Sequence, residues 1–377
     1  MSDQFTQVTT EGWGSRLAGS FVAVLIGLLL VPVSVGLLYW NEGRAVQAIR
    51  ALDRGAAMIV EVNAAAIDPQ AEGKLVHTTG LMQPATPARD PEFGVTADGL
   101  LRLMRNVEMY QWQEDSSSQS QQSLGGSKTT ETTYTYKHVW SAQPIASANF
   151  KLPDNHRNPP MPLHSATFDG GGVKLGAYQV DPSLLNKLAA FAPLAAQSPP
   201  PQGYAAAADG FYRGPNPDAP SVGDLRVTFR AVAAQTVSIA AAQSGDRLAA
   251  YRDANGYPIA VAKSGVDTAA ALFNEEKQAE SQLTWILRSV GFVLMLIGLV
   301  CLTRPLTMLF AVVPFLESLV GAGAFLVALT LAIPLTLLTI ALAWIVHRPL
   351  IGGALLLATV LAALLLRRLH PRRLARG

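Results

Sequence analysis

The stretch that decides the fold is residues 13–44, which read WGSRLAGSFVAVLIGLLLVPVSVGLLYWNEGR. Its central part, Leu17–Leu38, is almost entirely apolar, and at about 1.5 Å per residue a helix of that length crosses the ~30 Å hydrocarbon core of a bilayer. Trp13 and Trp40 flank the apolar part, and tryptophan prefers the headgroup level. We therefore predict a transmembrane helix over 17–38. A cleaved signal peptide is the weaker interpretation, because no small-residue cleavage site follows.

Three further apolar runs lie in the last third of the chain, and Trp285 opens the first while Trp344 closes the second. They predict transmembrane helices at 285–303, 319–346 and 349–366. The segment 304–318 is too short to span the bilayer if Glu317 stays in water. It lies in the interface or re-enters the membrane, and we favour the interfacial arrangement.

Basic residues set the expected sidedness, because Lys and Arg concentrate in cytoplasmic flanks. The arginine-rich tail 367–377 is therefore placed in the cytoplasm, and Arg16 and Arg304 agree with that placement. We predict that the N-terminal tail 1–16 is also cytoplasmic and that the large domain 39–284 is extracytoplasmic.

Composition excludes several classes of function. The net charge is only +2, and in 39–284 Asp and Glu outnumber Lys and Arg, which argues against a nucleic-acid partner. The single cysteine, Cys301, lies inside the second predicted span, so we expect no intrachain disulfide and no cysteine-based zinc site.

The large domain mixes strand-like and helical segments, so the fold class is α+β: a polytopic α-helical membrane protein of four spans with a large extracytoplasmic α+β domain. A juxtamembrane helix is expected at 44–55. Strands are expected at 58–62, 74–82, 100–112, 129–140, 225–230, 237–242 and 248–251.

Local signals add detail to that domain. Ser116–Ser127 is rich in Ser, Gln and Gly and predicts a flexible loop. Asp181-Pro182 is typical of a helix start and predicts a helix over 183–191. Asn255-Gly256 predicts a hairpin turn. Residues 266–282 predict a stalk helix that runs into the second span.

Seven different short motifs lie along nearly the whole chain, in an order that is typical of one family. They are Asn41-Glu42-Gly43-Arg44-Ala45-Val46, Glu108-Met109-Tyr110-Gln111-Trp112, Phe211-Tyr212, Val222-Gly223-Asp224-Leu225-Arg226-Val227, Gly245-Asp246, Thr303-Arg304 and Arg348-Pro349-Leu350. With one span before the large domain and three after it, they resemble the transmembrane protein 43 family, also called LUMA. The resemblance implies a protein that organises membrane protein complexes, partly by self-association, in the endomembranes and inner nuclear membrane of animals. It implies no catalytic residue and no cofactor.

The amino-acid composition also indicates the kind of organism that encodes the chain. Alanine is abundant and Arg greatly outnumbers Lys, which is typical of a GC-rich bacterial genome. We therefore expect a bacterial inner membrane, with the large domain in the periplasm.

Charged side chains are almost absent from the apolar runs, which argues against a proton relay or pump. Arg288 lies within one turn of the outer interface, and snorkelling is its simpler role. The functional alternative is that Glu42 pairs with Arg288 or Arg348, or that Arg44 binds a carboxylate of the stalk helix. The candidate interface residues are Asn41, Glu42, Gly43, Arg44, Arg288, Arg304 and Arg348.

Small residues mark candidate helix contacts. Gly321 and Gly323 in the third predicted span, and Gly352 and Gly353 in the fourth, permit close approach of helices within one chain or between chains. We favour a homo-oligomer held by the second to fourth spans.

Metal and catalytic sites are not expected. His156 and His164 bracket a proline-rich loop near Asp154 and Asp169, but the spacing fits no ligand pattern, so surface loop histidines are the better interpretation. Asp169-Gly170-Gly171-Gly172 lacks the Lys and Ser/Thr of a phosphate loop, and no Gly-x-Ser-x-Gly elbow occurs.

The function that these observations favour is a non-enzymatic membrane scaffold that organises membrane protein complexes or lipids. Its partners would be the lipid bilayer, further copies of the chain and membrane proteins that the sequence does not identify. The alternative is a channel or membrane sensor component gated by the large domain. A membrane-bound hydrolase is disfavoured by the missing motif.

Overall fold

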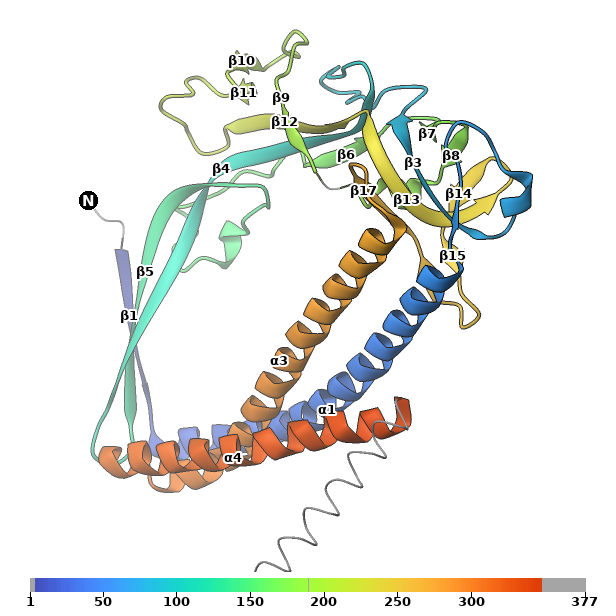
Figure 1. Ribbon diagram of the computed structural model, residues 1–377. Helices are drawn as coiled ribbons and strands as arrows, with labels where there is room; N and C mark the ends of the chain where they lie inside the picture. Colours follow the sequence, from blue (N-terminus) through green and yellow to red (C-terminus); the bar gives the residue numbers. More distant parts are fainter. Residues whose placement is uncertain (1–3, 189, 348–377) are drawn as a thin grey trace, which may run out of the picture. The chain divides into compact units, whose positions relative to one another are not determined.

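The computed structural model describes residues 4–188 and 190–347, and it divides into two compact units (Figure 1). Unit 1 consists of Met1–Val8, Ala51–Gln119 and Thr130–Glu276, and unit 2 of Thr9–Arg50, Ser120–Thr129 and Lys277–Gly377. The fourth predicted span, 349–366, and the tail 367–377 lie outside the described residues.

Three long helices supply the apolar segments of unit 2. They are α1 (Trp13–Met58), α3 (Ala269–Leu309) and α4 (Pro314–His347). Each contains an apolar window long enough to cross a membrane, so the described residues hold three candidate spans. Helix α3 runs without a break through Arg304 and Pro305, which leaves only 310–313 between α3 and α4.

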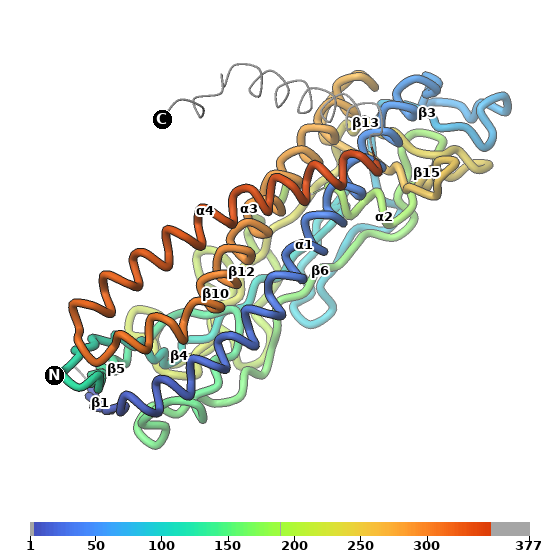
Figure 2. Tube along the Cα trace, turned by 90° about the horizontal axis from the view of Figure 1, so that it is seen from below, coloured from blue at the N-terminus to red at the C-terminus, as the bar shows by residue number. Residues whose placement is uncertain are grey.

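Helices α1 and α3 pack closely through glycine. A Cβ atom on Gly27 would lie 2.6 Å from the carbonyl oxygen of Gly298, and one on Gly291 would lie 2.6 Å from Leu38. Ser34 lies between these contacts and approaches Met295, with 3.5 Å between Oγ and Sδ. In Figure 2 the three helices run side by side. Without glycine at these positions, the two backbones could not approach so closely.

Most of the β structure belongs to unit 1 and forms two large sheets. The eight-stranded sheet has the order β1-β5-β4-β12-β11-β10, with β6 on β4 and β9 on β12. Its strands are β1 (Gln4–Glu11), β4 (Leu100–Gln122), β5 (Lys128–Ser141), β6 (Ala166–Asp169), β9 (Ala192–Leu194), β10 (Ala205–Ala207), β11 (Gly210–Arg213) and β12 (Leu225–Ala233).

The seven-stranded sheet contains a closed ring, because β13 pairs with both β14 and β3, and β8 and β7 complete the path between them. Its strands are β2 (Val60–Glu61), β3 (Leu75–Gln83), β7 (Lys174–Leu175), β8 (Tyr178–Val180), β13 (Gln235–Ser244), β14 (Arg247–Ala249) and β17 (Val261–Ser264). A core that includes Leu101, Tyr178 and Ile239 is packed against these strands. Closure removes free edges within the ring.

Short elements complete unit 1. Helix α2 (Pro182–Leu185) begins after Asp181, whose carboxylate accepts a hydrogen bond from the Ser183 amide, as predicted, but α2 is shorter than expected. Strands β15 (Tyr251–Arg252) and β16 (Pro258–Ile259) form the predicted hairpin around Gly256. Two 3₁₀ turns occur at Pro69–Ala71 and Ser147–Asn149.

One prediction about this region was wrong. The polar run Ser116–Ser127 was expected to be a flexible loop, but β4 continues to Gln122 and the turn covers only 123–127. The cause is the partner strand, since Thr132 bonds Ser118 across the pair at 2.9 Å between hydroxyl oxygens. Cross-strand pairing therefore overrides the loop-like composition.

Candidate functional site at the ends of the apolar helices

The motif that follows the first apolar run builds a charged cluster within unit 2. Arg288 of α3 donates two hydrogen bonds to Glu42 of α1, at 2.6 Å from Nε to Oε1 and 2.9 Å from Nη2 to Oε2. Trp344 of α4 donates its indole N–H to Oε2 of the same carboxylate at 2.7 Å. The Glu42 side chain is only 2% exposed. One carboxylate therefore joins all three helices.

The guanidinium of Arg288 is also covered by aromatic rings. Its Cζ lies 4.7 Å from the ring centroid of Trp285 and 5.9 Å from that of Trp344. Cation–π contacts are strongest where water is excluded. The structure therefore contains the ion pair with Glu42 that was the functional alternative for Arg288. The contact with the Trp344 ring was not predicted, because Trp344 is far from Arg288 in the sequence.

A second ion pair also joins α1 to α3. Arg44 pairs with Glu280 at 2.5 Å and contacts the Thr284 hydroxyl at 3.4 Å, while the Asn41 amide nitrogen donates to the Thr284 carbonyl at 3.1 Å. Asn41 is fully buried, and its Oδ1 has no hydrogen-bond partner among the described residues. The motif thus supplies two ion pairs and an amide that tie α1 to α3.

Gly43 makes room for α4 in this cluster. A Cβ at Gly43 would lie 2.8 Å from Nε2 of His347, whose ring also lies 5.3 Å from that of Tyr39. The His347 carbonyl accepts a hydrogen bond from Arg50 at 2.7 Å. Arg348, the other proposed partner of Glu42, lies outside the described residues.

A different polar cluster forms where α1 begins. Arg16 pairs with Glu317 of α4 at 2.7 Å and donates to the Gly126 carbonyl at 2.8 Å, and Gln122 donates to Glu317. The indole N–H of Trp13 donates to the Met308 carbonyl at 2.8 Å. The turn of the β4–β5 hairpin therefore docks on the helix ends. The charges of Arg16 and Glu317 were expected only to flank the membrane.

Backbone bonds confirm that docking of the hairpin turn. The Gly125 amide donates to the Val312 carbonyl at 3.0 Å. A Cβ on Gly126 would lie 2.7 Å from the Trp13 ring and 3.0 Å from the Ala311 carbonyl oxygen, and Gly126 has a φ of 79°. Gly126 is therefore required for this close approach, whereas a Cβ on Gly125 would meet nothing within 4 Å.

Clefts open beside this second cluster. One cleft of 380 Å³ is lined by residues that include Arg16, Lys128 and Arg304, and a second cleft of 220 Å³ shares Arg304 and is also lined by Gln122 and Gly321. Arg304 is exposed, and neither Lys128 nor Arg304 makes an ion pair among the described residues.

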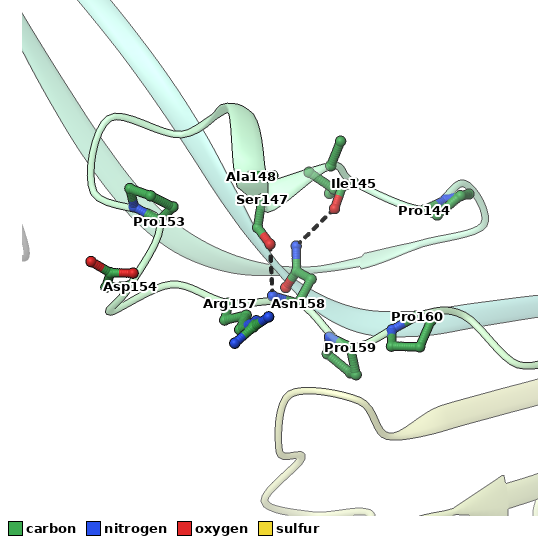
Figure 3. A pocket seen from close by; sticks show the side chains of 11 residues that line it. Pro144, Ile145, Ser147, Ala148, Pro153, Asp154, Arg157, Asn158, Pro159 and Pro160 are labelled. Carbon is green, nitrogen blue, oxygen red and sulfur yellow. Dashed lines mark hydrogen bonds between the residues drawn. The ribbon is translucent and has the colours of Figure 1, made fainter.

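A cavity of unit 1 lies elsewhere, between the loops that follow β5. It has 660 Å³ and is walled by Pro144, Pro153, Pro159 and neighbouring residues (Figure 3). Asn158 fixes the loops by donating its side-chain amide to the Ile145 carbonyl at 3.2 Å. The wall combines four prolines with the polar residues Ser147, Asp154, Arg157 and Asn158.

The interpretation of His156 was wrong in its placement. It is fully buried rather than on the surface, stacks on Tyr136 at 3.6 Å between centroids, and makes a 2.8 Å contact from Nδ1 to the Leu152 carbonyl. Burial also lowers the pKa of the neighbouring His138, with a smaller contribution from the charge of His156. Among the described residues, no group of side chains is arranged to hold a metal ion.

Three other motifs of the large domain meet within unit 1. The Tyr212 hydroxyl donates to Oδ2 of Asp224 at 2.6 Å, and Arg226 pairs with Glu108 at 2.6 Å. The Gly223 amide donates to the Tyr110 carbonyl at 2.9 Å. Burial and then the bond to Asp224 raise the pKa of Tyr212. These residues hold β4, β11 and β12 in register, which is a structural role.

The predicted helix-packing glycines have a different environment from that of Gly27. A Cβ on Gly321 or Gly323 would meet nothing within 4 Å, so neither glycine packs against another described part of the chain. Gly352 and Gly353 lie outside the described residues. The packing glycines that sequence reasoning missed are Gly27, Gly291 and Gly298.

Comparison with known proteins shows similarity over most of the chain. The family model described as transmembrane protein 43 matches residues 109–349. Transmembrane protein 43 of Rattus norvegicus is 32% identical, with 96% of this chain and 94% of the relative covered. The Homo sapiens protein of that name is 32% identical over 92% and 89%, and the Drosophila melanogaster homolog 32% over 89% and 91%. No solved structure matches the chain.

Proposed function

We propose, from the premise that this chain belongs to the transmembrane protein 43 family, that it is a membrane scaffold that works without catalysis. It would organise membrane proteins and lipids through the surfaces of its apolar helices. We also propose a bacterial inner membrane as its location and an extracytoplasmic position for 39–284. The composition and the basic flanks support these placements.

The observation that carries the proposal is the exposed apolar surface of the helices. Only 17%, 17% and 22% of the most apolar windows of α1, α3 and α4 are buried against other described residues. Exposed side chains include Leu25, Leu29, Leu326 and Leu337. Lipid and other helices are the partners that such surfaces accept.

The charged residues support scaffolding over transport. Glu42, Arg288, Arg44 and Glu280 are engaged in ion pairs that join helices. A transporter would instead use its intramembrane charges to bind a substrate or to relay protons.

Self-association is the part of this function that is easiest to test. Gly321 and Gly323 have open space around them and lie on one helix, so a second copy could approach there. We expect the full chain in mild detergent to have a mass of at least two 40.1 kDa protomers by mass photometry. Gly321→Leu combined with Gly323→Leu should shift the mass toward one protomer.

The matched control replaces Gly19 and Gly36 of α1 by leucine, since both also face open space. It should leave the mass unchanged. A wild-type chain that is monomeric at all concentrations would refute self-association. A conductance of the full chain in liposomes would support the channel or sensor function instead.

A further inference from the structure

The cleft beside Arg16 combines charge from several parts of unit 2. Its charged wall residues are Glu11 of β1, Arg16 of α1, Lys128 of β5, Arg304 of α3 and Glu317 of α4. Arg16 is committed to Glu317, since its side chain is only 8% exposed and is held at 2.7 Å. Lys128 and Arg304 make no ion pair among the described residues, and three cationic side chains face two carboxylates in this wall, so the cleft carries an excess of one positive charge.

Apolar surface adjoins this charge. Leu306, Phe310, Val313 and Phe315 are exposed around the end of α3 and the start of α4. Trp13 lies at the same helix ends, where it bonds Met308, and tryptophan favours the headgroup level of a bilayer. A ligand that fits both surfaces has an anionic head and an apolar body.

We propose that this cleft binds the phosphate of an anionic phospholipid, with Lys128 and Arg304 supplying the attraction and the Arg16–Glu317 pair fixing the wall. Basic pockets among membrane helices bind such headgroups. The acyl chains would lie on the exposed apolar surface of the α3–α4 link. The proposal rests on the proposed membrane function, which places these helix ends at the interface.

The proposed site also gives the β4–β5 hairpin a role in lipid binding. Lys128 lines the cleft beside the docked turn, where Gly126 allows close contact with α1 and the Gly125 amide bonds the α3–α4 link. The bound lipid would therefore connect the hairpin to the helices as well as the protein to the bilayer.

The test measures lipid binding by the full chain. Purified protein in mild detergent is titrated with phosphatidylglycerol, and bound lipids are counted by native mass spectrometry. Lys128→Gln combined with Arg304→Gln should weaken binding, by about fivefold for each charge removed. The control, Lys174→Gln with Lys187→Gln, removes two exposed charges of unit 1 and should bind as the wild type does.

Two further titrations separate the possible sources of the phosphate. Phosphatidylcholine should bind more weakly than phosphatidylglycerol, and millimolar inorganic phosphate should displace little of the bound lipid. Equal binding of both lipids, full displacement by inorganic phosphate, or unchanged binding by the double variant would each overturn the proposal.

The oligomer mass is recorded for every variant, because it reports on the proposed function separately. A double variant that keeps the wild-type mass and thermal stability but loses the lipid shows that the fold is intact. Wild-type lipid binding by a chain that does not self-associate would remove the oligomeric scaffold and leave the lipid site standing.

Discussion

Glu42 shows how one residue decides the arrangement of several helices. Its two carboxylate oxygens accept hydrogen bonds from Arg288 and Trp344, and its side chain is nearly inaccessible. A buried carboxylate is costly unless it is paired, and removing one partner leaves the other charge uncompensated. Sequence reasoning found the partner Arg288 because both residues border apolar runs, but Trp344 follows only from the three-dimensional packing.

We expect Glu42→Gln to destabilise the protein by about 3–5 kcal/mol, because Arg288, whose side chain is only 17% exposed, would lose its anion. The thermal midpoint in detergent should fall well below that of Glu131→Gln, a control at an exposed position. The double variant Glu42→Gln with Arg288→Gln should recover part of the loss, since no lone charge remains. A midpoint of Glu42→Gln equal to the wild type would show that the ion pair contributes nothing.

The packing of α1 on α3 depends on which glycines of the two helices face each other. Every apolar run contains glycine, so the sequence cannot tell which glycines face a partner helix. Gly27 and Gly298 face each other, whereas Gly321 and Gly323 face open space. The same limit explains the error at Ser116–Gln122, because a polar segment becomes a strand only when a partner strand lies beside it.

We predict that Gly27→Val separates α1 from α3, because its Cβ would lie 2.6 Å from the Gly298 carbonyl oxygen. Overpacking of this kind typically costs about 1–3 kcal/mol. The comparison is Gly36→Val on the same helix, whose Cβ would meet nothing within 4 Å. Equal thermal midpoints for the two variants would contradict the close contact.

The sidedness of the whole molecule receives two different predictions. Flanking charges place 1–16 in the cytoplasm and 39–284 outside it. Strand β1, however, is the neighbour of β5 in one sheet, with the hydroxyl oxygens of Thr10 and Thr129 at 3.2 Å. Paired strands must lie on one side of the hydrocarbon, because open sheet edges are not tolerated inside it. The architecture class was predictable from apolar runs, whereas this long-range pairing leaves no signal in composition.

An engineered disulfide between β1 and β5 can distinguish the two arrangements. In a Cys301→Ser background, we expect Thr10→Cys with Thr129→Cys to cross-link in native membranes on mild oxidation. Ser118→Cys with Thr132→Cys is the positive control, since those hydroxyls lie 2.9 Å apart within the hairpin. Cross-linking of the control pair alone would favour the sidedness predicted from charge.

The pairing of β1 with β5 also has a consequence for the order in which the chain is synthesised and folds. Its bonded threonines are 127 and 119 positions apart, so β1 is synthesised long before its partner exists. At translation rates of about 5–20 residues per second, the delay is on the order of ten seconds. The whole of α1 is made during that delay, and its apolar part can enter the bilayer while β1 is still single. Whatever retains β1 on one face of the membrane during those seconds therefore determines whether the sheet can ever be completed.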